Sequence, residues 1–178
     1  MTCQPLFDLL KNHVGIIVQV ITASAILITA IATLIQARRL KTSLQFETLS
    51  RIVERFENNS YQEKRKSAAL TCLKNLKKRK PGVEVEDVLD FFDEVAFLVR
   101  SGVLTKKMVW HEFYHWVRLY WQAAGKYVIE RRLEEPAVWE DLYWLYPKLN
   151  DIEKKKYPCH YKEKLTEKDL KKFLKEEF

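Results

Sequence analysis

The chain has 178 residues with a formal net charge of +7, and 47% of its residues are apolar. This length predicts one domain large enough to bury a core, and the 12% aromatic content excludes a wholly disordered chain. Only four glycines are present, too few for a β-sandwich, a Rossmann unit or a P-loop fold. The three cysteines lie far apart, which excludes a disulfide framework or a zinc ribbon and favours a reducing compartment.

The strongest local signal is an apolar segment at residues 14–37, VGIIVQVITASAILITAIATLIQA, which carries no charge. A helix of this length spans about 36 Å, more than the roughly 30 Å of a hydrocarbon core. Ala23-Ser24-Ala25 resembles a signal-peptidase site, but cleavage there would divide the apolar run, which ends directly at Arg38-Arg39. We therefore predict an uncleaved transmembrane helix at 14–37.

The charges that flank this segment predict its orientation. Residues 1–13 form a short tail with a single lysine, whereas Arg38, Arg39 and Lys41 follow the segment. Because Lys and Arg favour the cytoplasmic side, we expect a single-pass protein of the cell membrane, with the tail outside and the C-terminal part cytoplasmic. The same three cations are expected to contact anionic lipid of the inner leaflet. Small residues recur every four positions in the segment, which favours either helix self-association or simple lipid contact.

Helical signals continue after the segment. No Gly or Pro occurs between Arg38 and Pro81, so we predict a helical stalk at 38–58. Ser60, followed three residues later by Glu63, predicts a capping box that opens a second helix. The basic run and breaker at 77–82 predict the end of that helix.

Two amphipathic helices follow. A third helix is expected at 86–100, with apolar residues on one side and acids on the other, and Ser101-Gly102 is expected to end it. Thr105 is then expected to cap a fourth helix from Lys106 to about Leu133. One broad apolar face of that helix gathers Val109, Trp110, Phe113, Trp116, Val117, Tyr120, Trp121, Ala124 and Val128.

The remaining segments complete an all-α prediction. Pro136 is expected to open a fifth helix, and Pro147 to stop it. Residues 59–149 would then form a cytosolic helical bundle, giving about five helices after the transmembrane one. Residues 150–178 would form a charged C-terminal tail with a short helix opened by Thr166.

The stretch from Asp87 to Val128 resembles a known family. Its acidic apolar helix, short glycine turn and aromatic helix ending in Tyr120-Trp121 are similar to a family of small prokaryotic proteins catalogued only as a domain of unknown function. The likeness extends to the apolar segment and to 136–149. It implies an N-terminal membrane helix before an all-α cytosolic part, and it implies no catalytic residues.

One motif has a catalytic pattern. His111-Glu112-Phe113-Tyr114-His115 matches H-E-x-x-H, in which two histidines share a helix face and bind zinc while the glutamate acts as general base. A membrane-tethered zinc metallohydrolase using His111, Glu112 and His115 is therefore one alternative function.

Two observations count against this metal site. The two histidines lie on a polar stripe with three cations, Lys107, Arg118 and Lys126, which disfavours a dication unless acids approach from elsewhere. No Gly-x-x-His follows to supply a third ligand. A di-iron site would need a second E-x-x-H, which the chain lacks. The sequence therefore predicts no metal and no cofactor.

Two charged stripes are candidate interaction surfaces. The acidic face of the third helix carries Asp90, Asp93 and Glu94 around the aromatic Phe97, and the basic face of the fourth carries Lys107 and Arg118. These stripes either pair with charges of opposite sign on another protein or are simply solvated.

The sequence thus favours a membrane-anchored interaction or scaffolding module without evident catalytic activity. A second alternative is a regulatory subunit of a membrane signalling complex. The expected partners are the lipid bilayer and either further copies of this chain or a partner membrane protein. Nucleic acid is not expected, because the basic clusters are interleaved with acids and no nucleic-acid motif is present.

Overall fold

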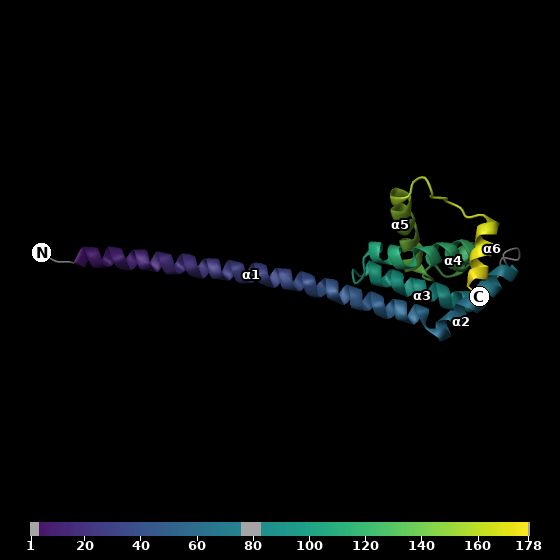
Figure 1. The fold of residues 1–178 in the computed structure, drawn as a ribbon, viewed down its shortest axis with the longest axis horizontal. Coiled ribbons are helices and arrows are strands. Elements are labelled where there is room, and N and C mark those ends of the chain that lie inside the picture. The colour runs from purple at the N-terminus through teal and green to yellow at the C-terminus, as the bar shows by residue number, and fades with distance from the viewer. Residues whose placement is uncertain (1–3, 76–82, 178) are drawn as a thin grey trace. The chain divides into compact units, whose positions relative to one another are not determined.

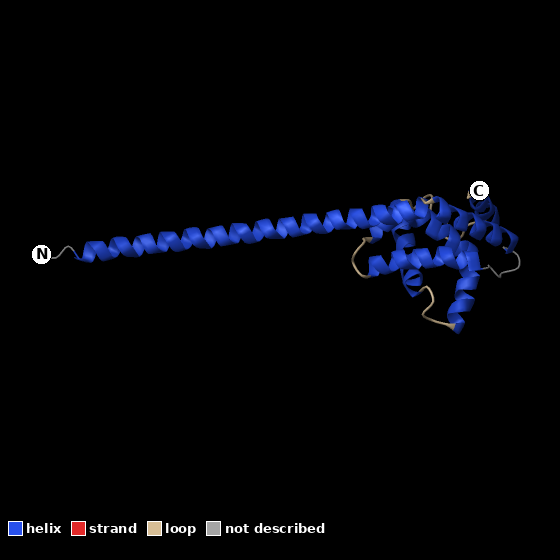
Figure 2. Cartoon of the chain, turned by 90° about the horizontal axis from the view of Figure 1, so that it is seen from below, coloured by secondary structure: helices blue, strands red, loops and turns tan. Residues whose placement is uncertain are grey.

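A computed structural model of the protein describes residues 4–75 and 83–177. The chain divides into two compact units, residues 1–46 and 47–178. Every regular element within the described ranges is a helix, and these ranges contain no strand (Figure 2). The all-α prediction, with a long apolar N-terminal helix before a helical bundle, is confirmed.

The first unit consists of most of helix α1, Gln4–Glu57. Its apolar side chains are exposed wherever they are described between residues 18 and 35; Leu34, for example, is 62% exposed. The hydroxyls of Thr22, Thr29 and Thr33 each donate to the carbonyl four residues earlier, at 2.8–2.9 Å. Among the described residues, one helix is long and apolar enough to cross a membrane, and it is this one.

The second unit contains the end of α1 and five further helices (Figure 1). These are α2 (Asn59–Asn75), α3 (Val83–Arg100), α4 (Lys106–Glu134), α5 (Glu140–Lys156) and α6 (Glu167–Glu176). Helix α3 contacts α2, α4 and α5, whereas α6 contacts α2 and α4. One core therefore lies among all of these helices.

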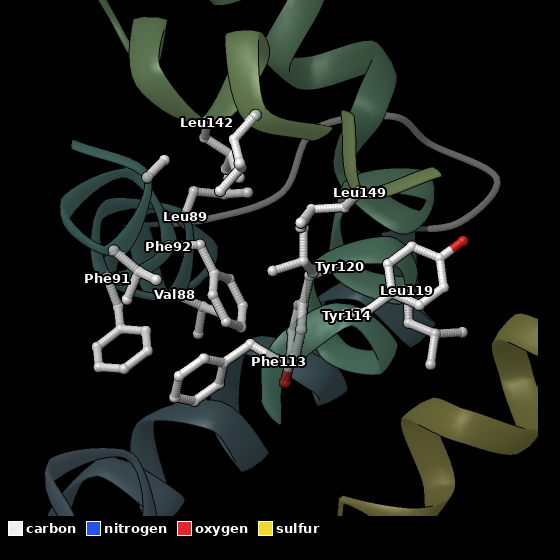
Figure 3. Packing of buried hydrophobic residues seen from close by; sticks show 14 of the residues in the cluster. Val88, Leu89, Phe91, Phe92, Phe113, Tyr114, Leu119, Tyr120, Leu142 and Leu149 are labelled. Carbon is white, nitrogen blue, oxygen red and sulfur yellow. The ribbon is translucent and has the colours of Figure 1, made fainter. Parts of the chain in front are cut away.

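Aromatic rings dominate this core. Phe56, near the end of α1, is 3% exposed and lies 5.2 Å from the ring of Phe91 and 5.4 Å from that of Phe113. Tyr120 is fully buried, with its ring 6.4 Å from Phe92. Figure 3 shows the rings of α3 and α4 packed together with Leu142 and Leu149 of α5. Such rings bury 150–250 Å² each, so they supply much of the apolar driving force for folding.

Helix α4 is buried on more sides than its sequence pattern indicates. Tyr114 and Leu119 are 7% and 5% exposed, although neither belongs to the predicted apolar face. Figure 3 shows both on the opposite side of the cluster from Phe91 and Phe92. Because α4 contacts α3, α5 and α6, only a narrow stripe that includes Lys107, His111 and Lys126 stays exposed.

Several predicted helix ends are confirmed. The Thr105 side chain accepts from the Met108 N–H at 3.2 Å and caps α4. Thr166 and Asp169 form a capping box at the start of α6. Gly102 has a φ of 75°, in the left-handed region that favours glycine, and it follows the end of α3 as expected.

Three predicted helix ends are wrong. Pro136 does not open α5, which begins at Glu140. The cap of α2 is Asn58 rather than Ser60, because the Asn58 side chain accepts from both the backbone N–H and the hydroxyl of Ser60, each at 2.9 Å. Pro147 does not stop α5, which continues to Lys156 and packs its leucines into the core. The tertiary contacts of α5 therefore outweigh the backbone hydrogen bond that proline removes. The predicted end of α2 at 77–82 lies outside the described residues.

Candidate functional site

The H-E-x-x-H motif lies on the first half of α4, and its residues have different surroundings. The side chain of His111 is 75% exposed, and its Nε2 lies 3.8 Å from the carboxylate of Glu112. The ring of His115 packs edge-on against Phe173 of α6, with centroids 5.5 Å apart. Burial lowers the pKa of His115, opposed by the charges of Glu176 and Glu177. His115 therefore serves as a contact for α6.

Among the residues that the structure describes, no three potential ligands gather around this motif. Within residues 4–75 and 83–177, no group of three or more His, Cys, Asp and Glu side chains is placed to hold a metal ion. A hydrolytic zinc site normally needs three protein ligands and an open position. The described arrangement therefore provides no observation in favour of the zinc alternative.

The acidic stripe of α3 is occupied by contacts within the chain. The Asp90 carboxylate accepts from the indole N–H of Trp139 at 2.7 Å, and the Asp93 carboxylate accepts from the Leu142 N–H at 2.8 Å. Glu94 forms a two-point ion pair with Arg55 of α1, at 2.8 and 3.1 Å. These acids therefore join α3 to α5 and to α1.

Asp93 takes the place of a missing helix cap. Trp139, the residue before α5, has a φ of 49° and makes no capping bond with its own side chain. The carboxylate of Asp93 instead accepts from the third N–H of that helix. Burial raises the pKa of Asp93, and the Leu142 N–H opposes that shift. The local sequence around α5 does not predict this cap, because Asp93 and Leu142 are 49 positions apart.

Phe97 differs from its acidic neighbours because it remains on the surface, with 55% of its area exposed. On the predicted basic stripe, Lys107 is also exposed, whereas Arg118 is only partly so. Arg118 donates to the main-chain oxygen of Lys162 and lies over the ring of Tyr161, 5.5 Å from its centroid. Phe97 and Lys107 are therefore surface residues, whereas Arg118 contributes contacts within the fold. Arg38, Arg39 and Lys41 are exposed on α1.

Three tryptophans donate to carboxylates, a feature that sequence reasoning missed. Besides Trp139 with Asp90, Trp110 donates to Glu153 at 2.9 Å, and Trp116 donates to Glu177 at 3.0 Å. A buried indole N–H normally needs such an acceptor. No sequence spacing predicts these pairs, because the partners are 43 to 61 residues apart.

A second missed feature lies at the C-terminal end. The Glu177 side chain is 8% exposed, and its carboxylate lies 3.6 Å from Nε of Arg65, whose side chain is 12% exposed. The hydroxyl of Tyr120 donates to the same carboxylate at 3.4 Å. The guanidinium of Arg65 also stacks 4.1 Å from the centroid of Phe56. Glu177 therefore connects α2 and α4 through one buried charge network.

Comparison with known proteins adds one match. Residues 20–149 match the family model described as Domain of unknown function (DUF4760). No curated protein and no solved structure matches the chain. The matched residues run from the apolar part of α1 to Leu149 in α5 and make up more than half of the chain. The chain therefore belongs to this family of domains of unknown function.

Proposed function

We propose that this chain is a single-pass membrane protein whose second unit is a cytoplasmic interaction or scaffolding module. The observation that carries the proposal is the surface of α1. Its described side chains between residues 18 and 35 expose isoleucines and leucines at 47–67%, and no part of the first unit covers them. Water is a poor solvent for such a surface, whereas the hydrocarbon core of a bilayer is a good one.

The polar groups of this segment support the same proposal. A hydroxyl inside hydrocarbon is costly unless it forms a hydrogen bond. The hydroxyls of Thr22, Thr29 and Thr33 donate to carbonyls of their own helix, so they need no water. Arg38, Arg39 and Lys41 then follow as exposed cations, each worth about 1 kcal/mol near an anionic lipid surface. Their excess over the single Lys11 of the tail favours a cytoplasmic second unit.

The native cysteines provide a direct test of membrane topology. Cys159 is exposed, whereas Cys72 is 3% exposed and burial raises its pKa to about 12. Its thiol is therefore unreactive at neutral pH. Cys3 lies outside the described residues, in the tail that we place outside the cell. In intact cells treated with an impermeant reductant, an impermeant maleimide should label the wild type at Cys3.

Two matched variants assign the label. Cys3→Ser should abolish labelling of intact cells and leave Cys159 to be labelled only after the membrane is permeabilised. Cys159→Ser should still be labelled at Cys3 in intact cells and should gain no further label on permeabilisation. Labelling of Cys159 in intact cells would reverse the proposed orientation. Extraction of the chain from membranes by alkaline carbonate would contradict the membrane span itself.

The interaction role needs a separate test. Native mass spectrometry of the full-length protein released gently from detergent reads its uncleaved mass, its copy number and any foreign chain. We expect either an oligomer or a complex with a partner membrane protein, reduced by Phe97→Ser because Phe97 is an exposed aromatic side chain. Lys106→Ala, which replaces an exposed residue at the start of the next helix, is the control and should leave association unchanged. A protein that is monomeric under all mild conditions would contradict the scaffolding role.

A further inference from the structure

Among the described residues, two of the five tryptophans, Trp121 and Trp144, depart from a pattern that the other three follow, and Trp121 does so at a cleft in the second unit. Trp110, Trp116 and Trp139 each donate their indole N–H to a carboxylate of the chain. Within the described part of the chain, the indole N–H of Trp121 has no such acceptor, although the ring is partly buried. Its ring is instead stacked on Tyr146 of α5, with centroids 4.9 Å apart and planes inclined by 23°.

Trp121 lines an open cleft of about 440 Å³ between α4, α5 and the segment that leads into α6. This volume falls in the range of small-ligand sites, about 300–1,000 Å³. The other lining residues are Gln122, Gly125, Tyr146, Asn150, Tyr161, Glu163, Lys164, Leu165 and Leu170.

Gly125 keeps this cleft open. It lies inside α4, where glycine costs about 1 kcal/mol relative to alanine. A Cβ at this position would meet no atom within 4 Å, so packing within the chain does not require a glycine. Its φ is not positive either, so the backbone does not require one. A larger side chain here would occupy the cleft.

Apart from the exposed Glu163 carboxylate, the main hydrogen-bonding groups left over in the cleft are donors. Gln122 is fully used: its amide N–H groups donate to the Tyr146 hydroxyl and the Glu163 carbonyl, and its oxygen accepts from the Leu165 N–H. The Tyr146 hydroxyl accepts from Gln122, which leaves its own proton to donate. Asn150 accepts from the Tyr114 hydroxyl, which leaves its amide N–H groups. The Trp121 N–H adds a further donor.

Charges of both signs surround the cleft. Lys164 and Glu163 are both exposed at the rim and offset one another. The guanidinium of Arg118 lies over the ring of Tyr161, one of the lining residues, at 5.5 Å, and the Asp151 carboxylate acts on the same tyrosine. The free donors of the cleft, rather than a net charge, therefore favour a ligand with acceptor oxygens.

We propose that this cleft binds a small aromatic carboxylate. The ligand ring packs against Trp121 and Tyr146, and its carboxylate accepts from the Trp121 N–H and from Lys164. The ligand thus supplies to Trp121 the kind of acceptor that Asp90, Glu153 and Glu177 supply to three of the other four indoles. This inference does not depend on the membrane or scaffolding proposal.

Calorimetric titration of the full-length protein in lipid nanodiscs tests the inference. The ligands are indole-3-acetate and its neutral amide, indole-3-acetamide, each titrated also into empty nanodiscs. We expect the carboxylate to bind with a Kd below about 1 mM and the amide to bind roughly tenfold more weakly, because charged acceptors form the stronger hydrogen bonds.

Three variants locate the binding. Gly125→Leu should weaken it at least about tenfold by filling the cleft, with no loss of thermal stability because leucine favours a helix. Trp121→Phe retains a ring but removes the N–H and should weaken binding about fivefold. Ile129→Ala, one turn away from Gly125 at an exposed position, should leave binding unchanged. Equal binding of acid and amide, absence of binding, or undiminished binding to a folded Gly125→Leu variant would each overturn the proposal.

Discussion

Removal of the Glu177 carboxylate should destabilise the second unit far more than its position near the chain end indicates. In Glu177→Ala, the Arg65 guanidinium loses the carboxylate 3.6 Å from its Nε while its side chain stays 12% exposed. The indole N–H of Trp116 and the hydroxyl of Tyr120 lose an acceptor as well. The substitution thus leaves the Arg65 guanidinium and the Trp116 N–H without this acceptor, whereas the Tyr120 hydroxyl still has the Arg65 carbonyl.

The magnitude follows from the burial of these groups. Breaking a buried ion pair costs about 3–5 kcal/mol, and each unmatched neutral donor costs about 1–3 kcal/mol. Arg65 is not completely buried, so water can reach it in the variant, and Tyr120 retains the Arg65 carbonyl at 3.2 Å as a second acceptor. We therefore expect a total loss of about 2–4 kcal/mol, less than the sum of these separate costs. For a unit of this size, each kcal/mol lowers the midpoint of thermal unfolding by roughly 3–5 °C.

The neighbouring residue provides the control. Glu176 is exposed and lies 3.7 Å from Lys172, so Glu176→Ala should cost less than about 0.5 kcal/mol. Denaturant unfolding of the full-length protein in mild detergent, followed by tryptophan fluorescence, measures both variants. Arg65→Met in the Glu177→Ala background should recover part of the loss, because it removes the unmatched cation. Equal effects of the two glutamate substitutions would refute the buried network.

Further substitutions test the remaining contacts. Asp93→Asn should be neutral or stabilising at pH 7 because the amide still accepts the α5 bond, whereas Asp93→Ala should cost about 1–2 kcal/mol as a lost cap. Burial raises the pKa of Asp93, so its protonated carboxyl stabilises the fold at low pH, and this stabilisation is lost as the pH rises through the folded-state pKa. The free energy of unfolding should therefore vary less with pH in Asp93→Asn than in the wild type. A stronger variation in the variant would contradict this sign. His111→Ala should change stability by less than about 0.5 kcal/mol, whereas His115→Ala should cost more because that ring contacts Phe173; the reverse order by thermal unfolding would contradict the described packing. Pro147→Ala should raise the unfolding midpoint, since alanine restores an N–H inside α5, and a lower midpoint would show that the proline is required there.

Local signals predicted the helices and most of their ends. Thr105 and Thr166 were identifiable as caps because the residues they serve lie within three positions. The sequence does not distinguish Asn58 from Ser60 as the cap of α2, because both are good capping residues and only the geometry separates them. It also suggests wrongly that Pro147 ends α5, because the cost of the proline is local, whereas the leucines of α5 are stabilised by contacts with α3 and α4.

The contacts of the charged faces were beyond sequence reasoning for a physical reason. Helical periodicity shows which residues share a face, but not which element packs against that face. Asp90 and Asp93 read as part of a solvated stripe, although α5 approaches them from about 49 positions away. The burial of Leu119 follows in the same way from α6, which is brought in from a distant part of the chain.

This distinction decides how the interaction surface should be mapped. Substitution of Asp90, Asp93 or Glu94 removes a bond between helices, so a loss of association in such a variant would report a weakened fold. Phe97 is 55% exposed, and its replacement changes the surface while the inter-helix bonds of those acids remain. Lys107 is likewise exposed. Variants at these two positions therefore separate partner binding from folding, provided that unfolding midpoints are measured on the same samples.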